Sequence, residues 1–169
     1  MAKILFIDDE AYVMQGLVFS LRDHHTVHIA TDGAEAMSEL RQHHDDYDLV
    51  ILDLMLPKGS PIDPNDSIPD MPAENVGEYI FQKHSMLGES IPTVILTPTR
   101  VSLNGLRTAP RLCLATKPVR IAHLLATIDR LLIDARDRRT TEALNEEPPL
   151  SVKLLRTNVV SIRPKDDAI

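Results

Sequence analysis

Short apolar runs recur along the chain, and each one ends in a polar residue. In the clearest, four apolar residues from Leu49 to Leu52 lead directly into the carboxylate of Asp53. Apolar runs without polar alternation are typical of strands buried on both faces, as in parallel sheets covered by helices. This pattern predicts five strands, at residues 3–7, 26–30, 49–53, 92–97 and 111–116.

Residues with helical spacing lie between these runs. In the first such segment, Val13, Leu17 and Leu21 fall on one face. Strands that alternate with helices predict an α/β fold with a parallel sheet and right-handed crossovers. The expected helices lie at about residues 10–22, 34–43 and 74–87, and from residue 121 past residue 139.

Two segments interrupt the alternation. Pro98 and Pro110 bracket the connection between the last two strands, where only a short helix near residues 102–107 is expected. The longer interruption, residues 58–74, is a loop by composition. Loops of this length in compact domains are usually functional or disordered. This one contains Gly59, Pro61, Asp63, Pro64, Asp66, Pro69, Asp70 and Pro72.

Composition narrows the class of protein. The chain has 169 residues, 43% of them hydrophobic, which suits one domain with an extension. A net charge of −7 argues against a nucleic-acid surface. One Cys permits no internal disulfide, and no apolar run reaches membrane-spanning length. We therefore expect a cytoplasmic protein that binds neither nucleic acid nor membrane.

Carboxylates follow two of the predicted strands. Asp8 and Asp9 come directly after the first strand, and Asp53 ends the third. Since parallel strands end at the same edge of a sheet, these groups should converge there. Like charges that close need a counter-ion, and a cluster of carboxylate oxygens suits Mg²⁺. Asp8 and Asp9 could alternatively be helix-capping acids, but capping does not explain Asp53.

Polar residues also mark the ends of the last two strands, where Thr97 ends the fourth and Lys117–Pro118 follows the fifth. The ordered set Asp8–Asp9, Asp53, Thr97 and Lys117–Pro118 resembles the receiver domain of two-component response regulators, over roughly residues 3–135. The resemblance implies a flavodoxin-like, doubly wound, five-stranded parallel sheet with strand order 2-1-3-4-5. It places a receiver domain at residues 1–139, with an insertion at 58–74 and a C-terminal extension or tail at 140–169.

The resemblance also implies a role for each residue. Asp53 would accept a phosphoryl group from a kinase phosphohistidine or a small phosphodonor. Lys117 and Thr97 would bind the phosphoryl oxygens, and the Lys117–Pro118 peptide bond would be cis. The protein would be a phosphoacceptor rather than an enzyme, with self-catalysed phosphorylation and dephosphorylation at most. Mg²⁺ would be held by Asp8, Asp9, Asp53 and the backbone carbonyl of Met55.

Three features depart from the family pattern. Pro98 follows Thr97, where the family usually offers a backbone N–H to the phosphoryl group, and proline has none. Leu114 stands where the family usually has the Tyr or Phe of a rotamer switch. The insertion could cover Asp53 as a lid, and its acids could repel a phosphodonor. We therefore expect phosphorylation of Asp53 without the usual switch.

Two other readings of the site remain. A phosphorylation-independent receiver-like interaction module would keep the fold with a degenerate switch. A haloacid dehalogenase-type hydrolase would need a second Asp two residues after the nucleophile, where this chain has Met55. Under the receiver reading, the partners are a histidine kinase or phosphotransfer protein and a downstream protein target. We expect the far end of the last helix, residues 131–143, or the tail to contact a partner or a second copy.

Overall fold

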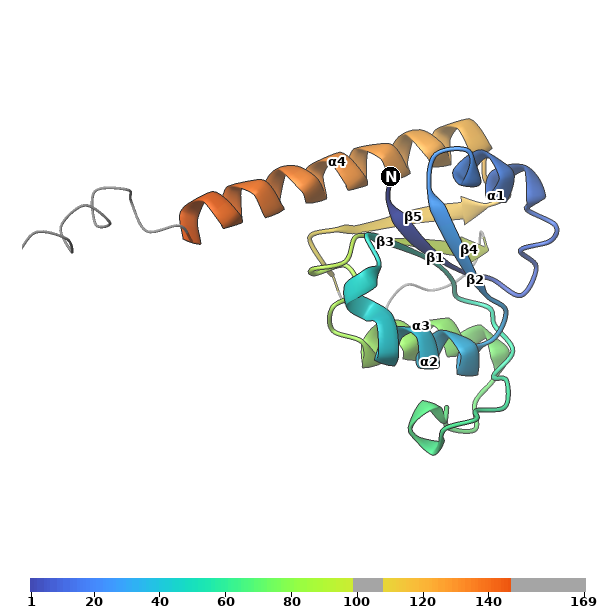
Figure 1. The fold of residues 1–169 in the computed structure, drawn as a ribbon. Coiled ribbons are helices and arrows are strands. Elements are labelled where there is room, and N and C mark those ends of the chain that lie inside the picture. The colour runs from blue at the N-terminus through green and yellow to red at the C-terminus, as the bar shows by residue number, and fades with distance from the viewer. Residues whose placement is uncertain (99–107, 147–169) are drawn as a thin grey trace, which may run out of the picture. The chain divides into compact units, whose positions relative to one another are not determined.

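The computed structural model describes residues 1–98 and 108–146, with side chains to residue 137. Five parallel strands form one sheet in the order β2-β1-β3-β4-β5 (Figure 1). This order confirms the predicted fold class. The strands are β1 (Lys3–Ile7), β2 (Thr26–Ala30), β3 (Leu49–Asp53), β4 (Thr93–Pro98) and β5 (Leu112–Lys117).

Helices cover both faces of the sheet. On one face, α2 and α3 enclose a core that includes Leu40, Leu52 and Phe81. On the other, α1 and α4 enclose a second core that includes Phe6 and Ile128. All five residues of β3 are buried, as its uninterrupted apolar run predicts. The helices are α1 (Gln15–Arg22), α2 (Gly33–His43), α3 (Ala73–Lys83) and α4 (Ile121–Glu146).

The chain divides into two parts, Met1–Arg136 and Asp137–Ile169. The first part holds the whole sheet and its two cores. In the second part, the described residues continue α4 to Glu146, so this helix does extend past residue 139 as predicted. Among the described residues, no helix combines the length and apolar character needed to cross a membrane.

The first helix begins later than predicted. Residues 9–14 form successive turns, in which the N–H of Val13 donates to the carbonyl of Glu10. The carboxylate of Asp8 accepts the N–H of Glu10 at 2.8 Å, which ties this segment to the strand end rather than to a helix. Val13 is consequently 65% exposed, and the prediction that it shares one helical face with Leu17 and Leu21 is wrong. Leu17 and Leu21 are buried as predicted.

The third helix ends earlier than predicted, at Lys83 rather than near residue 87. The chain then turns sharply into β4 through Gly88, whose φ of +74° favours glycine. The short helix predicted near residues 102–107 lies outside the described residues. A tight approach fixes the start of α3, because a Cβ on Gly77 would collide with the backbone of Asp53 and Leu54.

The insertion between β3 and α3 has its own structure, built around a short 3₁₀ helix at Pro64–Asp66. Arg41 of α2 binds it through two nitrogen atoms of its guanidinium. The Nε and Nη2 atoms donate to the two oxygens of buried Asp66 at 2.7 and 2.9 Å, and Nη2 also donates to Asp63 at 2.9 Å. We call Arg41, Asp63 and Asp66 the insertion clamp. Ile68 adds an apolar anchor in the core below α2 and α3.

Candidate functional site at the carboxyl edge of the sheet

Two buried carboxylates lie side by side at the carboxyl edge. The register pairs Ile7 of β1 with Leu52 of β3, so Asp8 and Asp53 follow at adjacent strand ends. Asp8 is fully buried and Asp53 is 3% exposed. Lys117, at the end of β5, donates from Nζ to the Oδ2 atoms of both, at 2.9 Å to Asp8 and 2.7 Å to Asp53. The ammonium therefore bridges two carboxylates from non-neighbouring parts of the chain.

Backbone N–H groups hold the remaining carboxylate oxygens. Asp8 Oδ1 accepts from Glu10, and Asp53 Oδ1 accepts from the N–H of Met55 at 3.1 Å. Both are contacts to the residue two positions later, a turn that Asp side chains commonly make at strand ends. Each carboxylate is thus fixed by one local contact and by the shared contact with Lys117.

Burial and hydrogen bonding have opposite effects on the pKa values of Asp53 and Lys117. Burial raises the pKa of Asp53, and the nearby charge of Asp8 raises it further; hydrogen bonds from Lys117 and Met55 oppose this without overcoming it. For Lys117, burial lowers the pKa, but hydrogen bonds to Asp53 and Asp8 outweigh burial and the pKa is raised overall. The ammonium stays charged, and Asp53 carries a desolvation penalty that one lysine does not remove.

A third carboxylate completes the cluster. Oxygen atoms of Asp8, Asp9 and Asp53 all lie within 4.8 Å of one another, and Asp9 is exposed at the surface. Three carboxylates facing one ammonium leave an excess of negative charge, and hard oxygen ligands of this kind fit Mg²⁺. The donor set therefore suits the ion that the sequence predicts. We call Asp8, Asp9, Asp53 and Lys117 the carboxyl-edge cluster.

Thr97 is the penultimate residue of β4, the strand between those that carry Asp53 and Lys117. Its side chain is buried, and its hydroxyl donates to the carbonyl of Pro98 at 3.1 Å. Pro98 pairs with Lys117 in the sheet register. The Lys117–Pro118 peptide bond is cis, as the resemblance implies.

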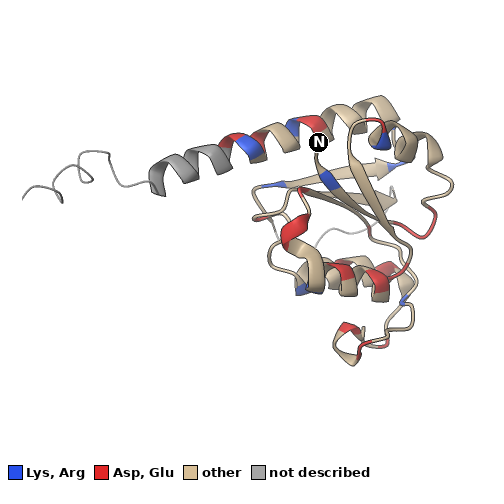
Figure 2. Cartoon of the chain, viewed as in Figure 1, with Lys and Arg blue, Asp and Glu red and all other residues tan. Residues whose placement is uncertain are grey.

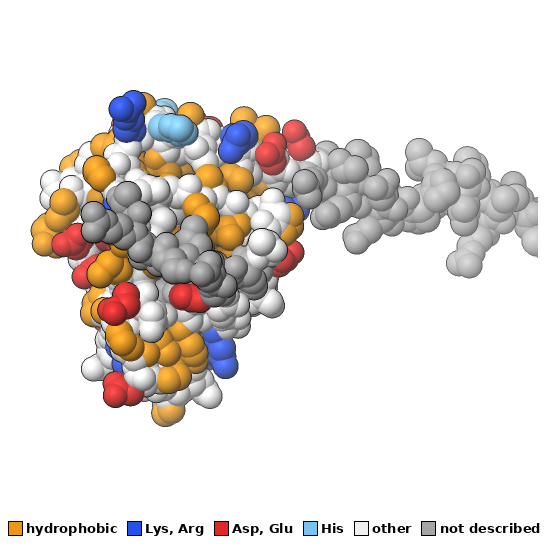
Figure 3. All heavy atoms as spheres, turned by 180° about the vertical axis from the view of Figure 1, so that it is seen from behind, with side chains coloured by type: hydrophobic (Ala, Val, Ile, Leu, Met, Phe, Trp, Pro, Cys, Tyr) orange, Lys and Arg blue, Asp and Glu red, His pale blue; other side chains and the backbone are white. Residues whose placement is uncertain are grey.

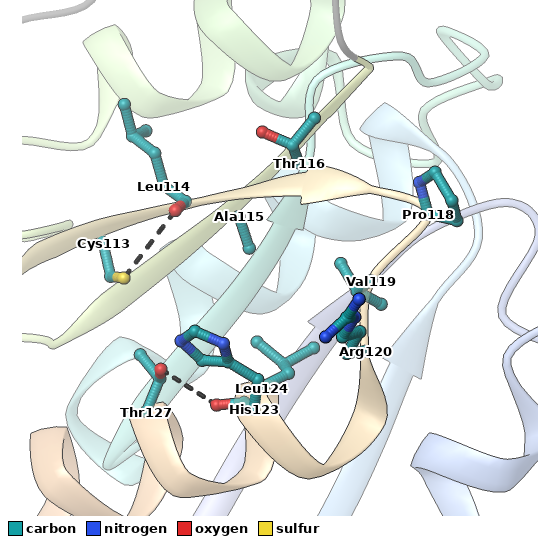
Figure 4. Close-up of a pocket in the computed structure, with 10 residues that line it drawn as sticks. All are labelled: Cys113, Leu114, Ala115, Thr116, Pro118, Val119, Arg120, His123, Leu124 and Thr127. Atoms are coloured by element: carbon teal, nitrogen blue, oxygen red, sulfur yellow. Dashed lines mark hydrogen bonds between the residues drawn. The ribbon is translucent and has the colours of Figure 1, made fainter.

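The strand that carries Lys117 is an edge strand with alternating faces. Cys113 and Ala115 point toward α4, whereas Leu114 and Thr116 point to the other side (Figure 4). A groove of about 280 Å³ runs along β5 and the first turns of α4. Leu114 is 45% exposed. Hydrophobic side chains are also visible over the face of the molecule drawn in Figure 3. The predicted departure at Leu114 therefore concerns a surface position.

The three aspartates of the insertion lie beside basic side chains. Asp63 and Asp66 bind Arg41, and Asp70 lies 3.9 Å from the ammonium of Lys58. The expectation that these acids repel a phosphodonor is therefore not supported for the clamp residues. Arg41 was missed by sequence analysis. In the sequence, Arg41 is only a basic residue on a predicted helix, 25 positions before Asp66, and nothing in the pattern links the two.

Comparisons with known proteins match part of the chain to one family. Residues 4–76 match the model of the response regulator receiver domain. Over 75 residues, or 42% of this chain, the sequence is 39% identical to an uncharacterized response regulatory protein of Staphylococcus epidermidis. The matched segment is only 29% of that protein's length.

Solved structures agree on the fold. A Francisella response regulator receiver domain has 21% sequence identity and a TM-score of 0.56, covering 79% of this chain and 98% of its own. A CheY-like receiver domain protein from Methanospirillum hungatei has 19% identity and a TM-score of 0.55, covering 82% and 98%. Residues 4–76 therefore match a response regulator receiver domain, and these solved structures, whose identities lie below 25%, show that the chain shares the receiver fold.

Proposed function

We propose that this receiver domain accepts a phosphoryl group on Asp53, with Mg²⁺ bound beside it. The observation that supports this most is the bridge from Lys117 Nζ to both Asp8 and Asp53. A lysine placed between two buried carboxylates is poorly explained by stability alone, since buried ion pairs often contribute little. It is well explained by a site that must neutralise an incoming phosphoryl group.

The proposed step is a transfer to a carboxylate oxygen. One oxygen of Asp53 attacks phosphorus, a P–O bond forms, and the bond from phosphorus to the donor breaks. The donor is a phosphohistidine imidazole or the leaving group of a small phosphodonor, and it departs with the bonding electron pair. Such transfers depend on positioning and charge neutralisation more than on covalent help. The product is an acyl phosphate on Asp53.

Several residues of the chain would help to neutralise the negative charge of the transferring phosphoryl group. Asp8, Asp9, Asp53 and the backbone carbonyl of Met55 would hold Mg²⁺, which supplies positive charge to the transferring group when bound. Lys117 would offer a second positive charge, since its ammonium is 2.7 Å from Asp53. Thr97 would exchange its contact with Pro98 for a phosphoryl oxygen.

The signal would leave through protein–protein contacts in a two-component or phosphorelay pathway. We propose a histidine kinase or phosphotransfer protein as donor and a protein as target, in the cytoplasm. Pro98 removes one backbone donor, and Leu114 has no hydroxyl or ring to couple to Thr97. The usual aromatic relay would therefore be absent, and the output would differ from that of a typical receiver.

The test is direct chemical phosphorylation. The full chain is incubated with acetyl phosphate and Mg²⁺, and intact mass is recorded alongside Asp53→Asn. A Mg²⁺-dependent, base-labile adduct that the variant lacks is the expected result. Calorimetric titration with Mg²⁺ is run on the same samples, since binding is expected even where this donor reacts slowly.

A phosphorylation-independent interaction module is the alternative. It would show neither adduct nor Mg²⁺ binding, and that pair of results would overturn the proposal. An adduct that persists in Asp53→Asn would instead move the acceptor to another residue.

A further inference from the structure

The outer edge of β2 is an unprotected strand edge. Within the described part of the chain, β2 pairs with β1 alone and ends the sheet on that side. Exposed edge strands usually carry charged residues or proline, which discourage pairing with another chain. The sequence of β2, Thr-Val-His-Ile-Ala, contains neither. This edge is therefore open to an added strand.

Two hollows flank the same edge, and Ile29 of β2 lines both. The hollow on the α1 side has a volume of about 320 Å³ and is walled by Tyr12 and Phe19. These two aromatic side chains are 69% and 63% exposed. The hollow on the α2 side has a volume of about 400 Å³, and residues of the insertion form its far wall. Side chains of an added strand alternate between the two faces of a sheet, so they would enter the two hollows in turn.

The wall supplied by the insertion is held in place. Ile62 is fully exposed, although the insertion clamp and the buried side chain of Ile68 anchor the residues that follow it. An anchored loop that presents an apolar side chain to solvent offers a contact at little entropic cost. Ser60 and Pro61 continue this wall toward β2.

The two hollows differ in charge. Asp32, Glu35 and Glu39 line the hollow on the α2 side, and no Lys or Arg does. Figure 2 marks acidic positions in red along α2 and α3. The hollow on the α1 side is mainly apolar, with one acid and one arginine among its lining residues. One face of an added strand would thus meet apolar groups and the other would meet carboxylates.

We propose that the β2 edge binds an extended segment of a partner protein in which apolar residues alternate with Lys or Arg. Backbone hydrogen bonds to β2 give affinity, and the two hollows give specificity. The apolar residues contact Phe19 and Tyr12. The basic residues lay their aliphatic stems against Ile62 and bring their charges to Glu35 and Glu39.

A second copy of this chain fits the edge less well. Another β2 brings no Lys or Arg to the carboxylates. A symmetric pairing would also bring the acidic hollows of the two copies together, and juxtaposed like charges oppose association. Charge therefore favours a different, basic partner.

The test uses the full chain and short synthetic peptides. One peptide alternates Lys with Val, a second alternates Glu with Val, and a third groups the same Lys and Val residues in two blocks. Amide chemical shifts are followed during titration, together with hydrogen exchange at residues 26–31. The Lys–Val peptide is expected to shift and protect these amides and to bind at least about tenfold more tightly than either control.

Two variants probe the two hollows without touching the core. Ile62→Arg adds a positive charge beside the carboxylates, and Phe19→Asp makes the apolar hollow polar. Each should weaken binding of the Lys–Val peptide by about tenfold. Ile133→Arg is the matched control, because Ile133 is 56% exposed on α4 and lines neither hollow.

Three results would overturn the proposal. They are equal binding of the three peptides, shifts that map away from β2, and loss of peptide binding in Ile133→Arg as well. Self-association of the chain that the Lys–Val peptide disrupts would assign the edge to a second copy instead.

Discussion

Two clusters of this domain are built alike and behave differently. In the carboxyl-edge cluster and in the insertion clamp, one basic side chain binds two carboxylates that lie far from it in the sequence. The clamp uses arginine, whose planar fork satisfies both oxygens of Asp66 at once. The carboxyl-edge cluster uses lysine, a single point charge that binds Asp8 and Asp53 while the carboxylate of Asp9 lies beside them.

The difference appears in the pKa of the acid that each cluster buries. Hydrogen bonds from Arg41 hold the pKa of Asp66 below its ordinary value, although burial opposes them. Burial holds the pKa of Asp53 above its ordinary value, although Lys117 opposes it. The clamp is a satisfied structural contact. The carboxyl-edge cluster retains unneutralised negative charge, and such groups gather where a protein binds cations or performs chemistry.

The largest expected effect is on Lys117→Met. This change leaves two buried carboxylates without their cation, and breaking a buried ion pair is strongly destabilising. Because the Lys117 side chain is 24% exposed, we expect a loss of about 2 kcal/mol in the free energy of unfolding, below the usual range for such pairs. Mg²⁺ should restore most of this loss by binding the folded state. Urea denaturation with and without Mg²⁺ measures both quantities.

Arg41→Met is the matched control from the other cluster. It also removes a cation from two carboxylates, but no third acid stands beside them among the described residues. Its stability should not recover with Mg²⁺. Equal rescue of both variants would mean that the two clusters do not differ as cation sites.

The next effect concerns the backbone that carries Asp53. Gly77→Ala places a methyl group against the backbone of Asp53 and Leu54, which cannot move aside as a side chain can. We expect a loss of about 2 kcal/mol, as for other overpacked sites. Gly16→Ala is the control, since its methyl group would meet only the end of the Ile121 side chain and alanine favours the helix. If both variants were equally stable, the close approach at Gly77 would have no energetic weight.

The same contrast explains what the sequence could predict. Asp8 and Asp53 were found because each ends an apolar run, and parallel strands bring their ends together. The clamp was not found, because the pairing of Arg41 with Asp66 depends on how an irregular loop folds back onto α2. Such loops have no periodic pattern of apolar residues from which contacts can be predicted.

The error at Val13 has a related cause. Its spacing from Leu17 suits a helix, but a side-chain contact from Asp8 to Glu10 diverts the chain into turns. Local hydrogen bonds from Asp compete with helix formation in this way. The carboxyl-edge cluster therefore shapes the segment that follows it.

Asp53→Asn should stabilise the fold by about 1 kcal/mol at neutral pH in the absence of Mg²⁺, because it removes a desolvated charge beside Asp8. A folded-state pKa raised above 3.8 means that ionisation costs more in the folded state. The native chain therefore loses stability as pH rises from 3.8 to the raised pKa, and the variant does not. Urea denaturation of both should coincide well below pH 3.8 and separate at pH 7. A difference that is unchanged at low pH would trace to packing rather than charge.

The smallest expected effect is confined to the insertion, and its dependence on pH is opposite to that expected from Asp53. Because the pKa of Asp66 is depressed below 3.8, its ion pair stabilises the folded state above that pH and is lost as pH falls through the depressed value. Acid should therefore loosen residues 60–68 while it relieves the repulsion between Asp8 and Asp53.

Hydrogen exchange by mass spectrometry, normalised to intrinsic rates, should show several-fold faster exchange in the insertion at low pH, with little change in β3. Asp66→Asn cannot titrate, so its insertion should exchange at a pH-independent normalised rate. Parallel loosening of β3 and the insertion would show that the two clusters unfold together and are not independent.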